Sequence, residues 1–385
     1  MQPNMFLKPD LIARAPDAPK LTLEGLKFID LFAGIGGIRI GFDKLGAECV
    51  FTSEKDKFAQ QTYLANFKDP DAAKKLIGGN FKVSEFHHVA GDITEVHEDD
   101  VPDHDILLAG FPCQAFSQAG LKKGLSDTRG TMFYHIARIL EAKRPDVFVL
   151  ENVKHLERHD KGNTFSIIYE KLTGLDYQIS YKVIDALHFV PQHRERIIII
   201  GTRGKDPISP NLLDQLTLPG ISPADNPMQR LRHILHDENS PSTEEPEGHY
   251  TLRRIHDDNS SIRVNEKYTI SDKLWNYLQE RKKIQTAKGN GFGYNLVDPD
   301  RQPGYTLSAR YYKDGSENLV PTPSGNPRKL TPRECARLMG FPDSFRIPVS
   351  DTQAYKQFGN SVAVPLFEAI AQLIAVHVEK KRSEA

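Results

Sequence analysis

One cysteine and one glutamate follow neighbouring apolar runs and could carry chemistry. Cys113 comes just after the run DILLAGF (105–111), and Glu151 lies at the end of the next run, VFVLENV (147–153). In a doubly wound sheet the carboxyl ends of the strands form the site, so we expect Glu151 beside Cys113. A cysteine there could act as a nucleophile if local positive charge or backbone N–H groups favour its thiolate.

Two arginines form a second group with chemical potential. Arg194 and Arg196 lie two residues apart in QHRER, just before the run RIIIIG, so on an extended chain they point to the same side. Two guanidinium groups on one face suit an anion or a carbonyl oxygen. The alternative is a surface ion pair with Glu195. Further along, QFGNSVAVP (357–365) is expected to form a loop into the last helix. Asn360 and Ser361 in it could bind a ligand or simply cap that helix.

A glycine loop and two acidic residues could bind an adenosine-type ligand. FAGIGG (32–37) ends an apolar run and opens a helix, where glycines allow a ligand close to the backbone. The dinucleotide pattern G-x-G-x-x-G fails because Arg39 stands where its third glycine should be. Glu54 lies 20 positions after Gly34, the usual place for a carboxylate that binds ribose hydroxyls, and Asp92 follows another predicted strand. A tight turn without a ligand is the simpler alternative.

These residues are spread along an alternation of short apolar runs and helical patterns. The predicted strands are 27–32, 48–54, 105–111, 147–153, 181–186 and 196–202. Helical patterns separate several of them, and helical periodicity returns at 331–341 and 364–378. Runs of four to seven apolar residues between helices predict a parallel sheet with helices on both faces, the doubly wound α/β class.

Composition bounds the class of protein. The 385 residues suffice for two or three domains at about 150 residues each. The net charge of −1 excludes a generally basic protein that coats nucleic acid, and 39% hydrophobic residues indicate an ordinary globular chain. We see neither a signal peptide nor an apolar run near the roughly 18 residues that span a membrane. The three cysteines form no CxxC pair, so we expect no disulfide framework, no metal site and a reducing cytosol.

The sequence changes in character after residue 203. Residues 205–250 are rich in Pro, Asp and Glu, which predicts loops. Residues 251–330 hold 14 Lys and Arg against 9 Asp and Glu, together with several tyrosines. The simple interpretation is a solvated second domain, and the alternative is a basic surface for nucleic acid.

Taken together, six ordered motifs resemble those of bacterial DNA (cytosine-5) methyltransferases. They are DLFAGIGG, GFPCQAFS, ENV, QHRER, RKLTPRECARLMGFPDSF and YKQFGNSVAVP. The resemblance implies a catalytic domain with a Rossmann-like, S-adenosylmethionine-dependent methyltransferase sheet over 27–203 and 328–385. It also implies a smaller, mostly irregular or β target-recognition domain over 204–327, where that family is variable, and an N-terminal arm over 1–26.

The resemblance also implies a mechanism. In that family a cysteine thiolate, here Cys113, adds to C6 of cytosine so that C5 can take a methyl group. Glu151 would give a proton or strong hydrogen bond to N3, Arg196 would hold O2, and Arg194 would support the base or the loop. The sequence does not identify the base that removes the C5 proton, for which a water is one option. Because C5 is inaccessible in a stacked duplex, the cytosine would be flipped out.

Other residues match binding positions of the family. Those that match positions for S-adenosylmethionine are Phe32, Gly34, Gly36, Glu54, Asp92, Ile93, Pro112, Asn360 and Ser361. Those expected to contact DNA are Gln114, Ser117 and Arg129 in a loop that closes over the flipped base, and Arg281, Lys282, Lys283, Lys288, Thr306 and Arg310 in the recognition domain. The recognition region faintly resembles enzymes that act on CC-centred targets such as CC(A/T)GG or CCNGG.

Three other functions compete with this interpretation. An RNA cytosine-5 methyltransferase on the same scaffold is disfavoured by the large basic segment, and a nicotinamide oxidoreductase by Arg39 and the Pro-Cys pair. A non-catalytic DNA-binding regulator is disfavoured by the intact set of Cys113, Glu151 and Arg196. We therefore expect a monomeric, cytoplasmic bacterial enzyme that acts on double-stranded DNA, in a restriction–modification system whose endonuclease would cut the same site.

Overall fold

The computed structural model describes most of the chain. The residues described are 21–67, 89–112, 132–203, 212–216, 218, 230–236, 252–254, 262–291, 293–323 and 325–384. Most of the predicted N-terminal arm and the predicted loop over the flipped base lie outside these ranges.

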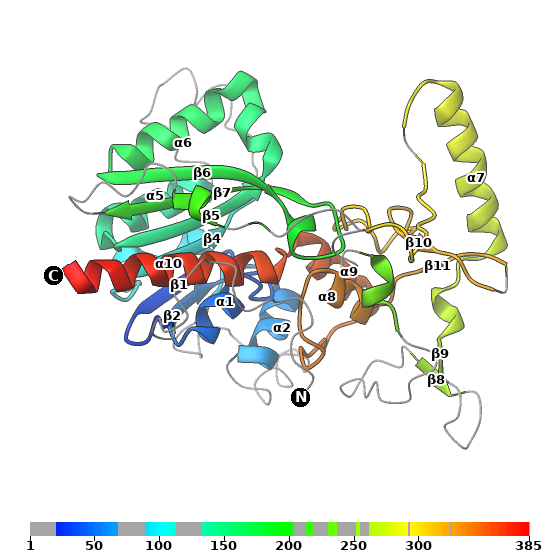
Figure 1. Ribbon diagram of the computed structural model, residues 1–385, viewed down its shortest axis with the longest axis horizontal. Coiled ribbons are helices and arrows are strands. Elements are labelled where there is room, and N and C mark those ends of the chain that lie inside the picture. Colours follow the sequence, from blue (N-terminus) through cyan, green and yellow to red (C-terminus); the bar gives the residue numbers. More distant parts are fainter. Residues whose placement is uncertain are drawn as a thin grey trace.

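A seven-stranded sheet forms the larger part of the molecule (Figure 1). The strands are β1 Lys27–Leu31, β2 Glu48–Ser53, β3 Val89–Ala90, β4 Ile106–Gly110, β5 Val147–Val153, β6 Tyr177–Asp185 and β7 Glu195–Arg203. Their order is β3-β2-β1-β4-β5-β7-β6, and the first five in this order run parallel. The carboxyl ends of these five strands therefore share one edge, as the doubly wound prediction requires.

The sheet departs from the parallel prediction at one strand. β7 pairs antiparallel with both β5 and β6. A parallel return needs a long crossover, but the connection between β6 and β7 is short and holds only the 3-10 turn Ala186–His188. β7 must therefore run back along β6, and it lies between β6 and β5.

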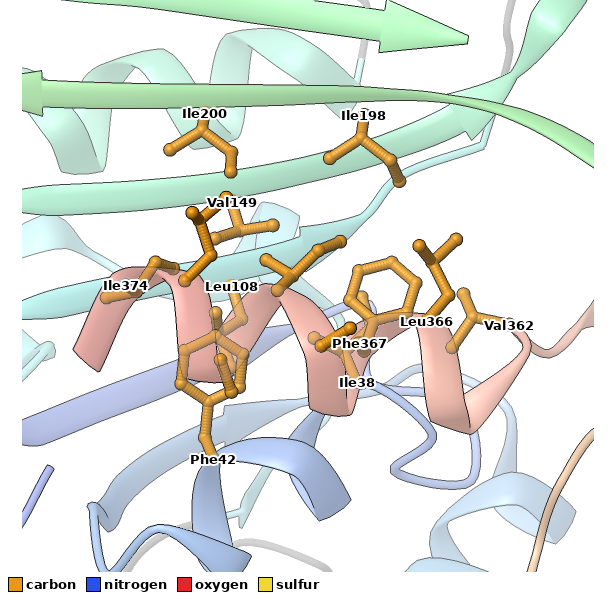
Figure 2. Packing of buried hydrophobic residues seen from close by; sticks show 14 of the residues in the cluster. Ile38, Phe42, Leu108, Val149, Ile198, Ile200, Val362, Leu366, Phe367 and Ile374 are labelled. Carbon is orange, nitrogen blue, oxygen red and sulfur yellow. The ribbon is translucent and has the colours of Figure 1, made fainter. Parts of the chain in front are cut away.

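Helices cover both faces of the sheet, which confirms the fold class. One face packs against α1 (Arg39–Lys44) and α10 (Val364–Glu384). Figure 2 shows Ile374 of α10 beside Val149 of the sheet, and Phe367 of α10 on the side nearer Ile198. The other face packs against α5 (Met132–Lys143) and α6 (Asn163–Thr173).

The helical stretch Asp351–Ser383, which comprises α9 and most of α10, is long and apolar enough to span a membrane. Most of its apolar part is buried inside the molecule. Its apolar side chains fill the core against the sheet, as Figure 2 shows for α10. The burial identifies it as a core helix.

A second part of the molecule lies beyond the end of the sheet that carries α8 and α9 (Figure 1). Its elements are β8 Leu252–Arg254, β9 Ile262–Val264, α7 Asp272–Ala287, β10 Leu319–Val320 and β11 Arg328–Lys329. Helices α2 (Lys57–Phe67), α8 (Pro332–Leu338) and α9 (Asp351–Asn360) adjoin it. Further 3-10 turns span Ile93–Glu95, Glu98–Asp100, Lys154–Gly162, Leu212–Gln215, Leu231–Ile234 and Glu266–Tyr268.

One apolar cluster joins this second part to α8 and α9. Leu231, Leu307 and Tyr311 pack with Leu338 and Phe358 in a continuous buried core. The cluster includes residues on both sides of position 328. The described residues before position 328 in this cluster are thus packed directly onto the helices that lead into α10.

Helix α7 differs from the mostly irregular or β character expected for this region. Ser271 caps its first turn, because its hydroxyl accepts a hydrogen bond from Leu274 N at 3.3 Å. The helix ends just before Gly289, whose φ of +73° suits a glycine. Figure 1 shows α7 at the end of the molecule away from the sheet.

Candidate active site

The ends of β4 and β5 bring Pro112 and Glu151 to one edge of the sheet. Gly110 of β4 pairs with Glu151 of β5, and a Cβ on Gly110 would lie 3.5 Å from a Glu151 carboxylate oxygen. Pro112 is exposed and ends the described segment. Cys113, the predicted nucleophile, lies outside the described residues, as do Gln114, Ser117 and Arg129.

Asn152 fixes the backbone that leads to Cys113. Its side-chain amide donates a hydrogen bond to Phe111 O at 2.9 Å, and the residue is almost fully buried. Its side-chain oxygen accepts from Val153 N at 2.8 Å. Sequence reasoning did not single out Asn152, although it stands in the motif ENV beside Glu151. Its contact sets the position of the strand end two residues before Cys113.

Glu151 is buried and paired with another predicted site residue. Its carboxylate lies 2.8 Å from Nε of Arg196, and the residue is 8% exposed. Burial raises the pKa of Glu151, while the guanidiniums of Arg196 and Arg194 lower it, and the net pKa lies above its usual value. A carboxyl group that keeps its proton more readily can donate a hydrogen bond to a ring nitrogen.

Arg194 and Arg196 have different hydrogen-bond and ion-pair partners, although the charges of both lower the pKa of Glu151. Arg196 pairs with Glu151 and not with the carboxylate of Glu195, which pairs with Lys154. The surface ion pair considered as an alternative is therefore wrong for Arg196. Arg194 is 2% exposed, and its guanidinium donates only to backbone carbonyl groups in the described structure. Burial lowers the pKa of Arg194, and the charge of Arg196 lowers it further.

The glycine loop after β1 has the backbone that its sequence suggests. Phe32, Gly34 and Gly36 have positive φ values of +55°, +56° and +81°. A Cβ at Gly36 would meet the ring of Phe67 at 2.2 Å, so only glycine fits there. At Gly34 a Cβ would meet no described atom within 4 Å. The loop is therefore tightly packed beneath Gly36 and open above Gly34, as a ligand cradle requires.

Two carboxylates flank this loop at the ends of β2 and β3. Glu54 accepts a hydrogen bond from Gly34 N at 2.7 Å, which joins it to the glycine loop. Asp92 accepts from Thr94 N at 3.1 Å and pairs with Lys55, and these contacts lower its pKa. Oxygen lone pairs remain on both carboxylates to accept hydrogen bonds from a ligand. Ile93 is buried behind Asp92.

The segment around Asn360 and Ser361 reaches the same loop. It was expected to be a loop into the last helix, but Gln357–Asn360 form the end of α9. A Cβ at Gly37 would lie 2.9 Å from Oγ of Ser361, so the glycine loop and this segment are in contact. Asn360 is exposed next to it. The residues present thus fit a nucleoside-type ligand between Gly34, Glu54 and Asn360.

The predicted DNA contacts form two groups. Thr306 and Arg310 are exposed, and Oγ1 of Thr306 donates to His193 O of QHRER at 2.5 Å. The remaining cations, Arg281, Lys282, Lys283 and Lys288, lie exposed on or just after α7. Lys282 differs from its neighbours, because its ammonium donates to Tyr294 O at 3.0 Å and lies 4.3 Å from the Tyr294 ring.

Sequence comparisons identify relatives of the whole chain. The family model of C-5 cytosine-specific DNA methylases matches residues 26–375. Type II methyltransferase M.SsoII of Shigella sonnei is 49% identical over 351 residues, covering 90% of this chain and 79% of that protein. Type II methyltransferase M.NlaX of Neisseria lactamica is 48% identical over 351 residues, covering 90% of this chain and 95% of that protein.

Solved structures agree on the fold. The S. pombe Dnmt2 methyltransferase superposes with a TM-score of 0.66 at 17% identity, covering 92% of this chain and 98% of that chain. A putative DNA modification methyltransferase from an E. coli prophage superposes with a TM-score of 0.59 at 23% identity, covering 92% and 100%. At these identities the superpositions bear on architecture alone.

Proposed function

The chain belongs to the C-5 cytosine-specific DNA methylase family, as a DNA (cytosine-5-)-methyltransferase of the type II restriction–modification kind that acts on double-stranded DNA, and from that premise we propose how its residues work. The Cys113 thiolate adds to C6 of cytosine, the C5–C6 π electrons move into the ring, and N3 takes a proton from Glu151. Arg196 holds O2. C5 would then take the methyl group of S-adenosylmethionine, whose S–CH3 bond breaks and leaves S-adenosylhomocysteine. A base removes the C5 proton, the C5–C6 double bond re-forms as the Cys113 thiolate leaves, and N3 returns its proton to Glu151.

The observation that carries this proposal is the buried pair of Glu151 and Arg196. Burial raises the pKa of Glu151, so the carboxyl group is suited to hold a proton for N3. Arg196 lies 2.8 Å from this carboxylate, close enough for one pyrimidine edge to meet both groups. Asn152 fixes Phe111, and with it the approach to Cys113.

The donor of the methyl group is S-adenosylmethionine, whose sulfonium centre supplies an activated methyl. Phe32, Gly34 and Gly36 would form its cradle, where the open space above Gly34 admits the ligand. Glu54 would accept hydrogen bonds from the ribose hydroxyls, and Asp92 would bind the adenosine edge with Ile93 beneath it. The remaining positions assigned to the cofactor are Pro112, Asn360 and Ser361.

The target is a flipped-out cytosine in a short duplex sequence. We propose that 27–203 and 328–385 form the catalytic domain, 204–327 the recognition domain, and 1–26 a short arm. The recognition site is CC-centred, such as CC(A/T)GG or CCNGG, and methylation protects it from a cognate endonuclease. The enzyme acts as a monomer in the bacterial cytoplasm. Bisulfite sequencing of DNA from expressing cells would identify the target and the methylated cytosine.

Covalent trapping tests the central step. Duplex DNA with 5-fluorocytosine in the mapped site lacks the C5 proton, so the Cys113 adduct cannot eliminate after methylation. We expect the wild-type chain to form a denaturant-resistant complex with this DNA in the presence of S-adenosylmethionine. Cys113→Ala should form none, whereas the control Cys49→Ala, which alters a buried thiol in β2, should still form it.

Two results would contradict the proposal. If Cys113→Ala still formed the trapped complex, the nucleophile would be a residue other than Cys113. Efficient methylation of tRNA but not of duplex DNA in a competition assay would show that the substrate is RNA.

A further inference from the structure

Alternate side chains of the motif QHRER (192–196) hold residues 304–308 of the proposed recognition domain, which we call the recognition segment. Gln192 and Arg194 contact the same residue, Leu307, from both sides of its peptide groups. Arg196, the next residue on that side, pairs with Glu151. A single stretch of five residues therefore connects the recognition segment to the proposed catalytic carboxylate.

Gln192 makes one of these two contacts to Leu307. Its side-chain oxygen accepts a hydrogen bond from Leu307 N at 2.6 Å, and its amide donates to Leu338 O of α8 at 3.3 Å. The residue is fully buried. A buried amide satisfied on both sides costs free energy to move, because either group would be left unpaired.

Arg194 makes the other contact to Leu307, and its guanidinium also binds the end of α9. One guanidinium nitrogen donates to Leu307 O at 3.0 Å, while another donates to Gly359 O at 3.1 Å and Ser361 O at 2.5 Å. Its backbone is fixed in turn, because Arg194 N donates to Asp185 Oδ1 at 2.9 Å. The same buried charge therefore ties the recognition segment to the loop that touches the cofactor cradle.

The two tied segments also pack directly on each other. A Cβ at Gly359 would lie 2.3 Å from the backbone of Ser308, so the end of α9 and the recognition segment meet without room for a side chain. Gly304 N donates to Pro191 O at 2.7 Å, and Thr306 donates to His193 O. Residues 304–308 are thus held along their length and cannot shift independently of 191–194.

We propose that Gln192 and Arg194 are positioning residues that couple DNA binding at 304–308 to cofactor binding at 360–361. The proposal rests on the function proposed above. A duplex that contacts the exposed Thr306 stabilises one arrangement of Leu307, and Arg194 transmits this arrangement to Ser361 through its shared hydrogen bonds. Displacing Leu307 would break its hydrogen bond with the buried guanidinium of Arg194, which costs free energy. The arrangement of 304–308 that binds DNA and the arrangement of 360–361 that binds the cofactor therefore favour each other.

Thermodynamic linkage makes this coupling measurable from either side. If duplex DNA tightens cofactor binding by some factor, the cofactor must tighten duplex binding by the same factor. The test measures the Kd of S-adenosylhomocysteine by calorimetry, with and without a duplex that carries the bisulfite-mapped site. For the wild type we expect the duplex to tighten binding about 5-fold or more, the range typical of coupled sites.

Two variants and one control separate positioning from general destabilisation. Arg194→Met keeps the length of the side chain but removes its donors, and Gln192→Met removes the bond to Leu307 N. Each should bring the ratio of the two Kd values toward one. Gln192→Met should change the duplex-free Kd little, whereas Arg194→Met should also weaken duplex-free binding, because Arg194 holds Ser361 O. Arg333→Met removes another buried guanidinium, which donates to Phe345 O at 2.8 Å, and should keep the wild-type ratio.

The possible outcomes distinguish a failure of the proposed function from a failure of the coupling alone. A wild-type chain that binds neither S-adenosylhomocysteine nor the duplex overturns the proposed function, and the coupling with it. A wild type that binds both with a ratio of one overturns only the coupling, as does a wild-type ratio in a folded Gln192→Met variant. Thermal melting shows which variants are folded, and Arg194→Lys provides a milder change at the same position.

Discussion

Glu151 shows how burial and a neighbouring cation act on one proton in opposite directions. Burial raises the pKa of the carboxyl group, whereas Arg196 and Arg194 lower it. The arginines reduce the free-energy cost of burying a carboxylate, and burial keeps the proton available. A carboxylate with only the arginines around it would be a poor proton donor, and one with only apolar neighbours would not be oriented toward a base.

The pH dependence of methyl transfer follows from this raised pKa. If Glu151 must be protonated to serve N3, its contribution is complete below the folded pKa and is lost as pH rises through it. Glu151→Gln should lower the single-turnover rate by about 100-fold or more and remove the alkaline decline that belongs to Glu151. The measurement is the rate of methyl transfer to duplex DNA as a function of pH.

A neighbouring carboxylate provides the control for this variant. Glu195→Gln alters an exposed glutamate at the start of the adjacent strand β7, where it pairs with Lys154, and it should leave both rate and pH profile close to wild type. If Glu151→Gln kept the wild-type rate with an unchanged alkaline decline, N3 would receive its proton from another group.

At the scale of elements, the start of α8 concentrates buried charge. Glu334 accepts from Thr331 N at 2.9 Å in a capping box, and both its oxygens bind the guanidinium of Arg328 at 2.7 and 2.8 Å. His236 N donates to it as well, at 3.0 Å. This one side chain therefore links α8 to β11 and to His236, just after the turn Leu231–Ile234. Breaking it should disturb the packing of α8 against both.

The stability of this element should depend on acid pH in a defined direction. Burial alone would raise the pKa of Glu334, but Arg328 outweighs it and lowers the pKa from 4.5 to about 2. Its stabilisation is therefore present above pH 4.5 and is lost as pH falls toward 2. Glu334→Gln removes the carboxylate that pairs with the buried guanidinium of Arg328 and should cost about 3–5 kcal/mol in urea unfolding at pH 7.

An exposed pair gives the matched comparison. Glu280→Gln removes the partner of Lys283 on α7, where both side chains are largely exposed, and should cost less than about 1 kcal/mol. Between pH 4.5 and 2 the unfolding free energy of Glu334→Gln should also fall less steeply than that of wild type. An equal cost for both variants would mean that the buried pair contributes no more than a surface pair.

The sequence predicts those elements whose contacts are local or periodic. The apolar runs locate the strands, and the rule that parallel strands end together brings Gly34, Glu54, Asp92 and Glu151 to one edge. The reversed β7 was missed because apolar content does not encode strand direction. Helix α7 was missed because, in the part of it that the structure describes, Leu278 is its only buried residue, so its sequence carries no apolar period.

The long-range contacts of Arg194 could not be read from the sequence. Its partners Leu307 and Ser361 lie 113 and 167 positions away, and they offer backbone carbonyls, which any residue type has. Spacing within QHRER predicted a shared direction for Arg194 and Arg196 but not different partners. The motif therefore locates the site, but the partners of each residue in the motif are known only from the fold.

At the scale of the whole molecule, charge is distributed unevenly. The chain has a net charge of −1, yet 251–330 carry 14 Lys and Arg against 9 Asp and Glu. The basic excess thus lies in the part where α7 stands apart from the sheet (Figure 1). An uneven distribution of this kind steers a polyanion to one end of the molecule without making the protein bind nucleic acid everywhere.

The salt dependence of DNA binding tests whether α7 contacts phosphates. Each phosphate contact releases counterions and contributes about 0.9 to the slope of log K against log salt. Arg281→Ala, Lys283→Ala and Lys288→Ala should each reduce the slope by about that amount, measured by fluorescence anisotropy with the mapped duplex. Lys282→Ala should reduce it less, because this ammonium is held by Tyr294. Lys171→Ala on α6, across the molecule in Figure 1, should leave the slope unchanged, and equal slopes for all five variants would place the duplex away from α7.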